Sequence, residues 1–311
     1  MADTIIIKSS DLIHVIPLVL LVFLLRALIL KWILHIVELY PKASFLKPDP
    51  NSKHPHLETA YAKSKTWNRR RLVELAELTG LPQDDVAEWL KRRRRDDDDL
   101  LKTFGENVCQ YTYYTLMFSF GVAILSDKPW PWDARECWRD HRDRRIGKEF
   151  WWYYMIPQAY YYANLVIHAT EPRRGRFAFV CVHHAVSAAL LTLSWIYGFV
   201  RAGSVVMVIH DSASVFLEAS KVAFTLKKDM AHALAFVVFT VVWMVTRMAL
   251  FPLWALRNFV DGPREVMFQD AGGYAMAGLL AVLFGLHCFS TYMIFKIFYN
   301  AGKVSRSKEH L

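Results

Sequence analysis

The sequence has few of the features that cross-link a secreted domain or mark a metal centre. It contains four cysteines, and three of them, Cys109, Cys181 and Cys288, fall inside long apolar runs. Cys137 is then left in a connecting segment without a partner, so no disulfide framework is expected. No Asn-x-Ser/Thr acceptor occurs anywhere in the chain, so N-glycosylation is not expected either.

The local mixing of polar and apolar residues that is typical of a soluble domain is also missing. Hydrophobic residues make up 54% of the chain, whereas its 38 Lys and Arg and 29 Asp and Glu gather between the apolar runs. The runs are long enough to cross a hydrocarbon core of ~30 Å as helices. We therefore predict an all-α polytopic membrane protein. Its roughly seven transmembrane helices are placed near 12–34, 108–125, 150–168, 177–199, 203–225, 231–256 and 272–299.

The first apolar run predicts an N-terminal anchor, because no small-residue cleavage site follows it. Arg26 lies within this run, where it either snorkels or faces a neighbouring helix. The positive-inside rule places the N-terminus in the lumen and the C-terminus in the cytosol. The predicted organisation is an anchor over 1–40, a cytosolic segment over 41–100, six spans over 101–302 and a cytosolic tail over 303–311.

The cytosolic segment contains two predicted short helices within 67–95, joined by a turn at Gly80, Leu81 and Pro82. The second helix resembles the recognition helix of a homeodomain, but Arg92 stands where a homeodomain has its adenine-reading Asn. No first helix is evident, so sequence-specific DNA binding is not expected. The four arginines at 92–95 are expected to attract anionic lipid headgroups of the membrane.

Ionisable residues in the middle of membrane spans indicate a functional site, and here they concentrate in two consecutive spans. The fourth span contains His183 and His184. The fifth contains a polar face made by Asp211, Ser214, Glu218 and Lys221, with His210 on its flank. A tight turn at 201–203 would make the two spans antiparallel neighbours. We then expect both groups to line one cavity that opens to the cytosol.

Imidazoles next to carboxylates suit acyl transfer. A neutral imidazole acts as a general base or as a nucleophile, and a carboxylate orients it and stabilises its protonated form. Metal binding is the competing use, but the spacing of these histidines is not diagnostic of a metal site, so none is expected. A purely structural alternative is that these groups hydrogen-bond between helices.

Residues 150–256 resemble the Lag1 motif and the surrounding TLC domain of the ceramide synthases. The motif covers about 177–225, and the homeobox-like segment at 67–95 is a second match. The matching stretches are WWYYMI at 151–156, HH at 183–184, LSW at 193–195, HD at 210–211, LE at 217–218, Lys221 and TRMALFPLW at 246–254.

This resemblance implies a TLC-type bundle in the endoplasmic reticulum membrane that joins an acyl group from acyl-CoA to a sphingoid base. It implies that His183 and His184 are the catalytic pair and that Asp211 is the first Asp of an H-D-x-x-D pattern. It also implies a homodimer, or a heterodimer with other members, and no bound cofactor. A cytosolic turn, EPRRGR at 171–176, lies beside the mouth of the predicted cavity and suggests Arg173, Arg174 and Arg176 as partners of the CoA phosphates. The alternative is that these arginines are ordinary positive-inside charge.

Three positions depart from the family pattern. Ser214 replaces its second Asp, Gly198 replaces an Asn after the LSW stretch, and Phe224-Thr225 replaces Asn-Tyr after the Lys. The alternatives to an active synthase are therefore a catalytically impaired member that regulates active ones, and a TLC-type protein that binds or transfers lipid.

Overall fold

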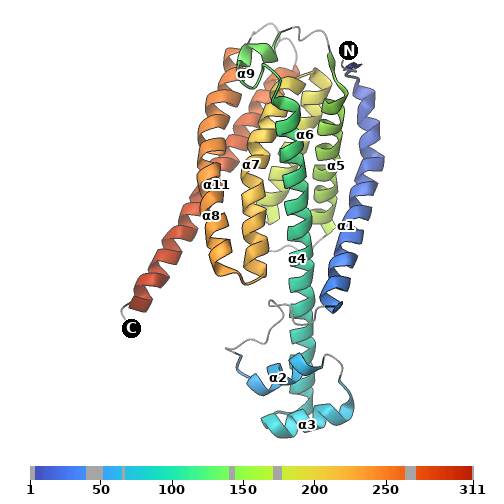
Figure 1. The fold of residues 1–311 in the computed structure, drawn as a ribbon, viewed down its shortest axis with the longest axis vertical. Helices are drawn as coiled ribbons and strands as arrows, with labels where there is room; N and C mark the ends of the chain where they lie inside the picture. The colour runs from blue at the N-terminus through green and yellow to red at the C-terminus, as the bar shows by residue number, and fades with distance from the viewer. Residues whose placement is uncertain are drawn as a thin grey trace. The chain divides into compact units, whose positions relative to one another are not determined.

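The computed structural model describes residues 4–39, 52–64, 67–139, 144–170, 177–262 and 271–309. Almost all of this part of the chain is helical, which confirms the predicted all-α class (Figure 1). The long helices are α1 (Val15–Leu39), α4 (Gln83–Leu125), α5 (Lys148–Thr170), α6 (Phe177–Tyr197), α7 (Val200–Thr225), α8 (Asp229–Trp243) and α11 (Ala271–Glu309). The shorter elements are η1 (Ser9–His14), α2 (Pro55–Lys63), α3 (Arg69–Thr79), η3 (Ala134–Cys137), the π-helix η4 (Met244–Leu256) and α9 (Arg257–Asp261).

Six helices within the described ranges are long and apolar enough to cross a membrane. They are Ser9–Ile33, Gln83–Leu125, Ala178–Tyr197, Val200–Thr225, Asp229–Asp261 and Ala271–Asn300. The remaining predicted span, 150–168, is also a helix, α5, but it does not reach this apolarity. Its buried residues include Gln158 and Asn164, whose polar groups are enclosed by protein instead of lipid.

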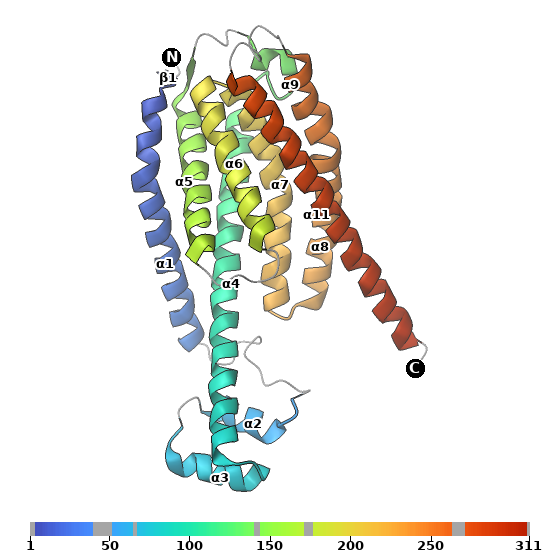
Figure 2. The ribbon, with the colours of Figure 1, turned by 180° about the vertical axis from the view of Figure 1, so that it is seen from behind.

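The chain divides into two compact units. The first comprises Met1–Leu25, Thr112–Leu217 and Ala235–Leu311, and the second comprises Arg26–Tyr111 and Glu218–Leu234. In the first unit α6 packs against both α5 and α11, as Figure 2 shows. Its core is rich in fully buried aromatic side chains, among them Trp195, Tyr153, Tyr154 and Phe251.

An antiparallel pair of short strands closes one end of the first unit. β1 (Thr4–Ile6) pairs with β2 (Arg145–Gly147), with Ile5 opposite Ile146. The Trp195 indole donates a hydrogen bond to the Lys8 carbonyl at 3.0 Å, which ties the same N-terminal segment to α6. Nearby in the chain, η3 contains Cys137, a free and buried thiol. Burial raises the pKa of this thiol to about 12, so it is not a thiolate at neutral pH.

The second unit contains a three-helix cluster with its own apolar core. Leu57 and Tyr61 of α2, Leu75 of α3, and Val86 and Leu90 of α4 are buried together. The predicted turn is confirmed, because Gly80 ends α3 with a left-handed φ of 69° and α4 begins at Gln83. The view that this segment lacks a first helix was wrong: α2 is that helix, and Pro55 at its first turn is a usual starting signal.

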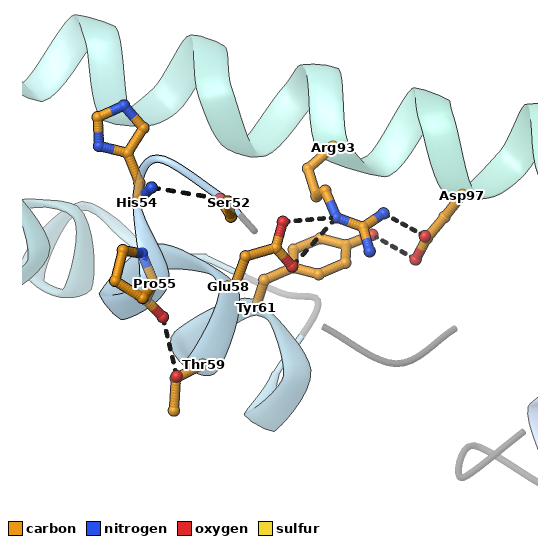
Figure 3. Close-up of polar contacts among 8 residues, drawn as sticks. All are labelled: Ser52, His54, Pro55, Glu58, Thr59, Tyr61, Arg93 and Asp97. Carbon is orange, nitrogen blue, oxygen red and sulfur yellow. Dashed lines mark hydrogen bonds and ion pairs between the residues drawn. The ribbon is translucent and has the colours of Figure 1, made fainter. Parts of the chain in front are cut away.

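The second predicted short helix is also corrected, because α4 runs without a break from Gln83 into the second span. No proline interrupts this stretch, and the RRRR-DDDD sequence at 92–99 places opposite charges one helical turn apart. Figure 3 shows Arg93 between the carboxylates of Glu58 and Asp97. The Tyr61 hydroxyl donates to Asp97 at 3.1 Å, so Arg93 belongs to the interior of the cluster while Arg92, Arg94 and Arg95 are exposed.

Arg26 faces a neighbouring helix, which is one of the two alternatives expected for this residue. Its guanidinium pairs with Glu106 of α4 at 2.8 Å. Gly105, next to Glu106, allows the close approach, because a side chain there would collide with Leu30 of α1. The cost of an arginine in an apolar span is thereby offset by a carboxylate on the adjacent helix.

Candidate active site

The turn between α6 and α7 connects the two helices that carry most of the predicted site residues. Gly198 follows the last residue of α6 with a left-handed φ of 80°, and the Phe199 N–H donates to the Ser194 carbonyl at 2.8 Å. The Gly198 N–H donates to the Trp195 carbonyl, which completes a Schellman motif. The turn therefore lies at 198–199, and the predicted turn at 201–203 was wrong because those residues already belong to α7.

Three helices approach closely just after this turn. The Tyr154 hydroxyl on α5 donates to the Val200 carbonyl at 3.1 Å and lies 2.9 Å from the Ser194 hydroxyl. Gly203 of α7 faces both groups, and a Cβ at this position would collide with the Tyr154 hydroxyl. α5, α6 and α7 are thus held together at this end of the first unit.

A cavity of the first unit begins beside this contact. Its walls are largely apolar and include Leu190 and Leu191 of α6 and Leu280 and Leu283 of α11. Polar groups from α7 and from tyrosines of α4 and α5 also reach it. These groups include His210, Asp211, Tyr113 and Tyr161. Asp211 and His210 are buried, with 6% and 8% of their surfaces exposed, so a carboxylate and an imidazole lie at the wall of an apolar space.

His183 and His184 are half-buried on α6 and are not part of the cavity lining. Ser187, one helical turn further along α6 from His183, does line it. Counting from the Ser194–Gly203 contact at ~1.5 Å per residue, His184 lies level with Ala213 of α7. The pair therefore lies about one turn beyond the cavity, at the end where Asp211 is found.

The two histidines have different surroundings. Their ring centroids are 5.8 Å apart and nearly perpendicular, as their adjacent positions on a helix require. The His184 ring stacks on His168 of α5 at 5.2 Å and contacts Tyr161 at 5.6 Å. His183 instead interacts electrostatically with the Arg247 guanidinium.

The predicted polar face of α7 is divided between the two units. Ser214 belongs to the first unit, where its hydroxyl donates to the His210 carbonyl at 3.2 Å. Glu218 and Lys221 belong to the second unit and form an ion pair at 2.6 Å. Within the described residues, Glu218 and Lys221 are therefore partners of each other and lie outside the lining of the cavity.

The sequence reasoning missed Arg247 and His287, which are central to the site. Arg247 of η4 is only 3% exposed and donates to the His210 carbonyl at 2.6 Å and to the Ser214 hydroxyl at 3.3 Å. His287 of α11 is 1% exposed, and its Nε2 lies 3.1 Å from both Arg247 Nη1 and His210 Nε2. Both residues are ionisable groups inside predicted spans, which is the same signal that marks the fourth and fifth spans as functional.

Aromatic side chains enclose this group. The Arg247 guanidinium lies 4.9 Å from the centroid of the Trp243 ring, and His210 and His287 each contact the Phe251 ring edge-on. The Trp243 indole donates to the Thr291 hydroxyl at 2.9 Å. A buried cation is thus held by hydrogen bonds and by an aromatic face, and no carboxylate of the described residues lies within ion-pair distance of it.

Two further predictions concern ligands. Among the residues that the structure describes, no group of three or more His, Cys, Asp or Glu could hold a metal ion. Arg173, Arg174 and Arg176, the predicted CoA partners, lie outside the described residues.

Comparison with known proteins finds one domain family and relatives that share one name. The TLC domain family matches residues 103–296. Human ceramide synthase 5 is 31% identical over 247 residues, covering 78% of this chain and 63% of the human protein. Mouse ceramide synthase 5 is 27% identical over 307 residues (96% of this chain, 73% of the relative), and ceramide synthase hyl-1 of Caenorhabditis elegans is 30% identical over 213 residues (64% and 58%). The chain thus spans less than two thirds of the human relative.

Proposed function

Because the chain belongs to the ceramide synthase family of TLC-domain proteins, we propose that it joins the acyl group of acyl-CoA to the amine of a sphingoid base. The products would be ceramide or dihydroceramide and free CoA, made in the endoplasmic reticulum membrane. The relatives described above are named ceramide synthases, which supports this general activity. The match of the TLC domain family covers the helices that form the cavity.

The observation that carries the proposal is the buried Asp211 carboxylate at the wall of a largely apolar cavity. A sphingoid base combines an ammonium group with a long alkyl chain. A carboxylate in a water-poor environment binds an ammonium group strongly, while leucine-lined walls suit the chain. Asp211 is thus our proposed anchor for the amine, with the alkyl chain between α6 and α11.

We assign the acyl-transfer step to the histidine pair. His184, supported by His183, acts as nucleophile or general base. A neighbouring carboxylate orients its imidazole ring. Their place about one helical turn beyond the cavity is where acyl-CoA would meet an amine held at Asp211. Arg173, Arg174 and Arg176 are proposed to bind the CoA phosphates. Neutralising all three should raise the KM for acyl-CoA and leave that for the sphingoid base unchanged.

Purified protein incubated with acyl-CoA and sphinganine tests the activity, with the N-acyl product detected by mass spectrometry. We expect product from the wild type and a large loss in Asp211→Asn, which keeps the shape but removes the charge. Asp229→Asn, at the exposed start of α8, is the matched control and should stay active. A stable wild type that binds sphinganine without forming product would contradict the proposal and favour a regulatory or lipid-binding role.

Replacing His184 by Ala should abolish N-acylation while the protein stays folded. Loss of a catalytic group typically costs 10²-fold or more in rate, whereas one polar side chain contributes only about 1 kcal/mol to a membrane fold. Turnover and thermal stability in detergent measure the two effects separately. Retained turnover in both His184→Ala and His183→Ala would refute this site assignment.

A further inference from the structure

Two imidazoles on different helices meet beside the cavity with their ring nitrogens facing each other. His210 Nε2 of α7 lies 3.1 Å from His287 Nε2 of α11, a hydrogen-bond distance. His210 lines the cavity next to Asp211, whereas His287 lies behind it and is almost completely buried. This pair is separate from His183 and His184, and the mechanism proposed above assigns it no role.

The neighbours of each ring determine where its protons lie. The His210 Nδ1 is 2.8 Å from the Val206 carbonyl, which can only accept, so this nitrogen carries a proton. A guanidinium can only donate, so the His287 Nε2 that faces Arg247 at 3.1 Å presents a lone pair. In the neutral state the two facing nitrogens are therefore both unprotonated. One additional proton on His210 Nε2 lets this nitrogen donate to the His287 Nε2 lone pair, which it then shares with the Arg247 guanidinium.

Acyl transfer to an amine requires a place for a proton. When a thioester acylates an ammonium substrate, a C–N bond forms, the C–S bond breaks, and the nitrogen loses two protons. One proton ends on the leaving sulfur of CoA, and the other must leave the site. His210 is the imidazole at the cavity wall, adjacent to the carboxylate proposed to hold the ammonium group.

We propose that His210 accepts this second proton and that His287, positioned by Arg247, stabilises the protonated His210 ring. This inference rests on the proposed N-acyltransferase function and adds a proton acceptor to it. Arg247 is a positioning residue, because it holds both His287 Nε2 and the His210 carbonyl. The proton then passes to solvent, which returns His210 to its neutral form for the next turnover.

The charged and titratable groups around the pair come from several helices. They are Arg247 of η4, His183 of α6 and Asp211 of α7, together with the cavity-lining phenols Tyr113 of α4 and Tyr161 of α5. Arg247 contacts the His210 carbonyl and the His287 ring, and Asp211 lines the cavity together with His210. The pH dependence of turnover therefore tests the role of His210 and His287 directly.

His287→Gln tests the assignment, because the Gln carbonyl can still accept from Arg247 but cannot stabilise a protonated His210 in the same way. We expect kcat with sphinganine to fall about 100-fold at pH 7, the lower part of the range for general acid–base catalysis, and to recover as pH rises. Thermal stability should stay near that of the wild type. His210→Gln is the second variant and should show the same dependence on pH.

Thr291→Val is the matched control, since Thr291 lies one turn from His287 and bonds its carbonyl and Trp243 but not its ring. It should lower stability without changing the shape of the pH–rate profile. Profiles of His287→Gln and His210→Gln that run parallel to the wild type would overturn this assignment while leaving the N-acyltransferase function intact. A wild type without N-acyl product at any pH would instead refute that function, and this inference with it.

Discussion

The contact with Arg247 explains how a serine can stand at position 214. In the sequence, Ser214 stands where the family pattern has a second Asp, on the helix face that it shares with Asp211. In the structure its hydroxyl is the acceptor of a hydrogen bond from a buried guanidinium at 3.3 Å. A carboxylate at this position would therefore meet a cation and would not be buried without a partner.

Ser214→Asp should consequently be tolerated and should increase N-acylation of sphinganine. The introduced carboxylate pairs with Arg247 and reduces the repulsion between that guanidinium and the ammonium group of the substrate. A double-mutant cycle with Arg247→Met should show a coupling energy of about 1–3 kcal/mol in thermal unfolding. Turnover at matched expression measures the effect on activity, and a slower enzyme would show that the site depends on the serine.

At the scale of single elements, the α6–α7 turn explains another departure from the family pattern. Gly198 replaces an Asn, and the structure shows that this position has a left-handed backbone. Gly and Asn are the residues that most readily adopt this conformation at the end of a helix. The exchange therefore preserves the turn and gives no reason to expect an altered site.

Gly198→Asn should accordingly leave both the melting temperature and the turnover close to those of the wild type. Gly198→Val should destabilise the protein by about 1–2 kcal/mol, because a branched side chain is strained at positive φ. Thermal unfolding in detergent compares the two variants directly. Equal melting temperatures for both would contradict the role of the turn.

The Arg93 cluster gives a second element-scale prediction. Arg93→Met removes the cation between Glu58 and Asp97, which are 4% and 3% exposed, so two buried carboxylates each lose an ion pair. Breaking a buried pair in this way costs about 3 kcal/mol or more. We expect faster hydrogen exchange in α2 and α3 of the full-length protein. Arg94→Met, on the exposed face of the same helix, is the control and should change little.

At the scale of the whole molecule, the orientation in the membrane stays a prediction. The chain contains no glycosylation acceptor, so any glycan on an engineered variant reports the introduced site alone. An Asn-x-Ser/Thr acceptor fused ahead of residue 1 should be glycosylated in microsomes, because a lumenal N-terminus is expected. The same acceptor fused after residue 311 should remain unmodified. The reverse pattern would place the termini on opposite sides from those predicted.

The sequence by itself determined the membrane class, the approximate positions of most helices and the polar residues of α6 and α7. These properties depend on hydrophobic runs and on short spacings, which are local in the chain. The continuity of α4 and the position of the α6–α7 turn could not be predicted from the sequence. They depend on ion pairs and on a single left-handed residue, which the hydrophobic pattern does not record.

Only the tertiary structure decided which polar groups meet. Arg247, His210 and His287 lie far apart in the sequence, and their contacts exist because η4, α7 and α11 pack together in the first unit. Helical periodicity places Asp211, Ser214, Glu218 and Lys221 on one face of α7, yet Asp211 lines the cavity while Glu218 and Lys221 pair with each other. Periodicity specifies the face of a helix, but the neighbours of that face are specified by long-range packing, which one sequence does not reveal.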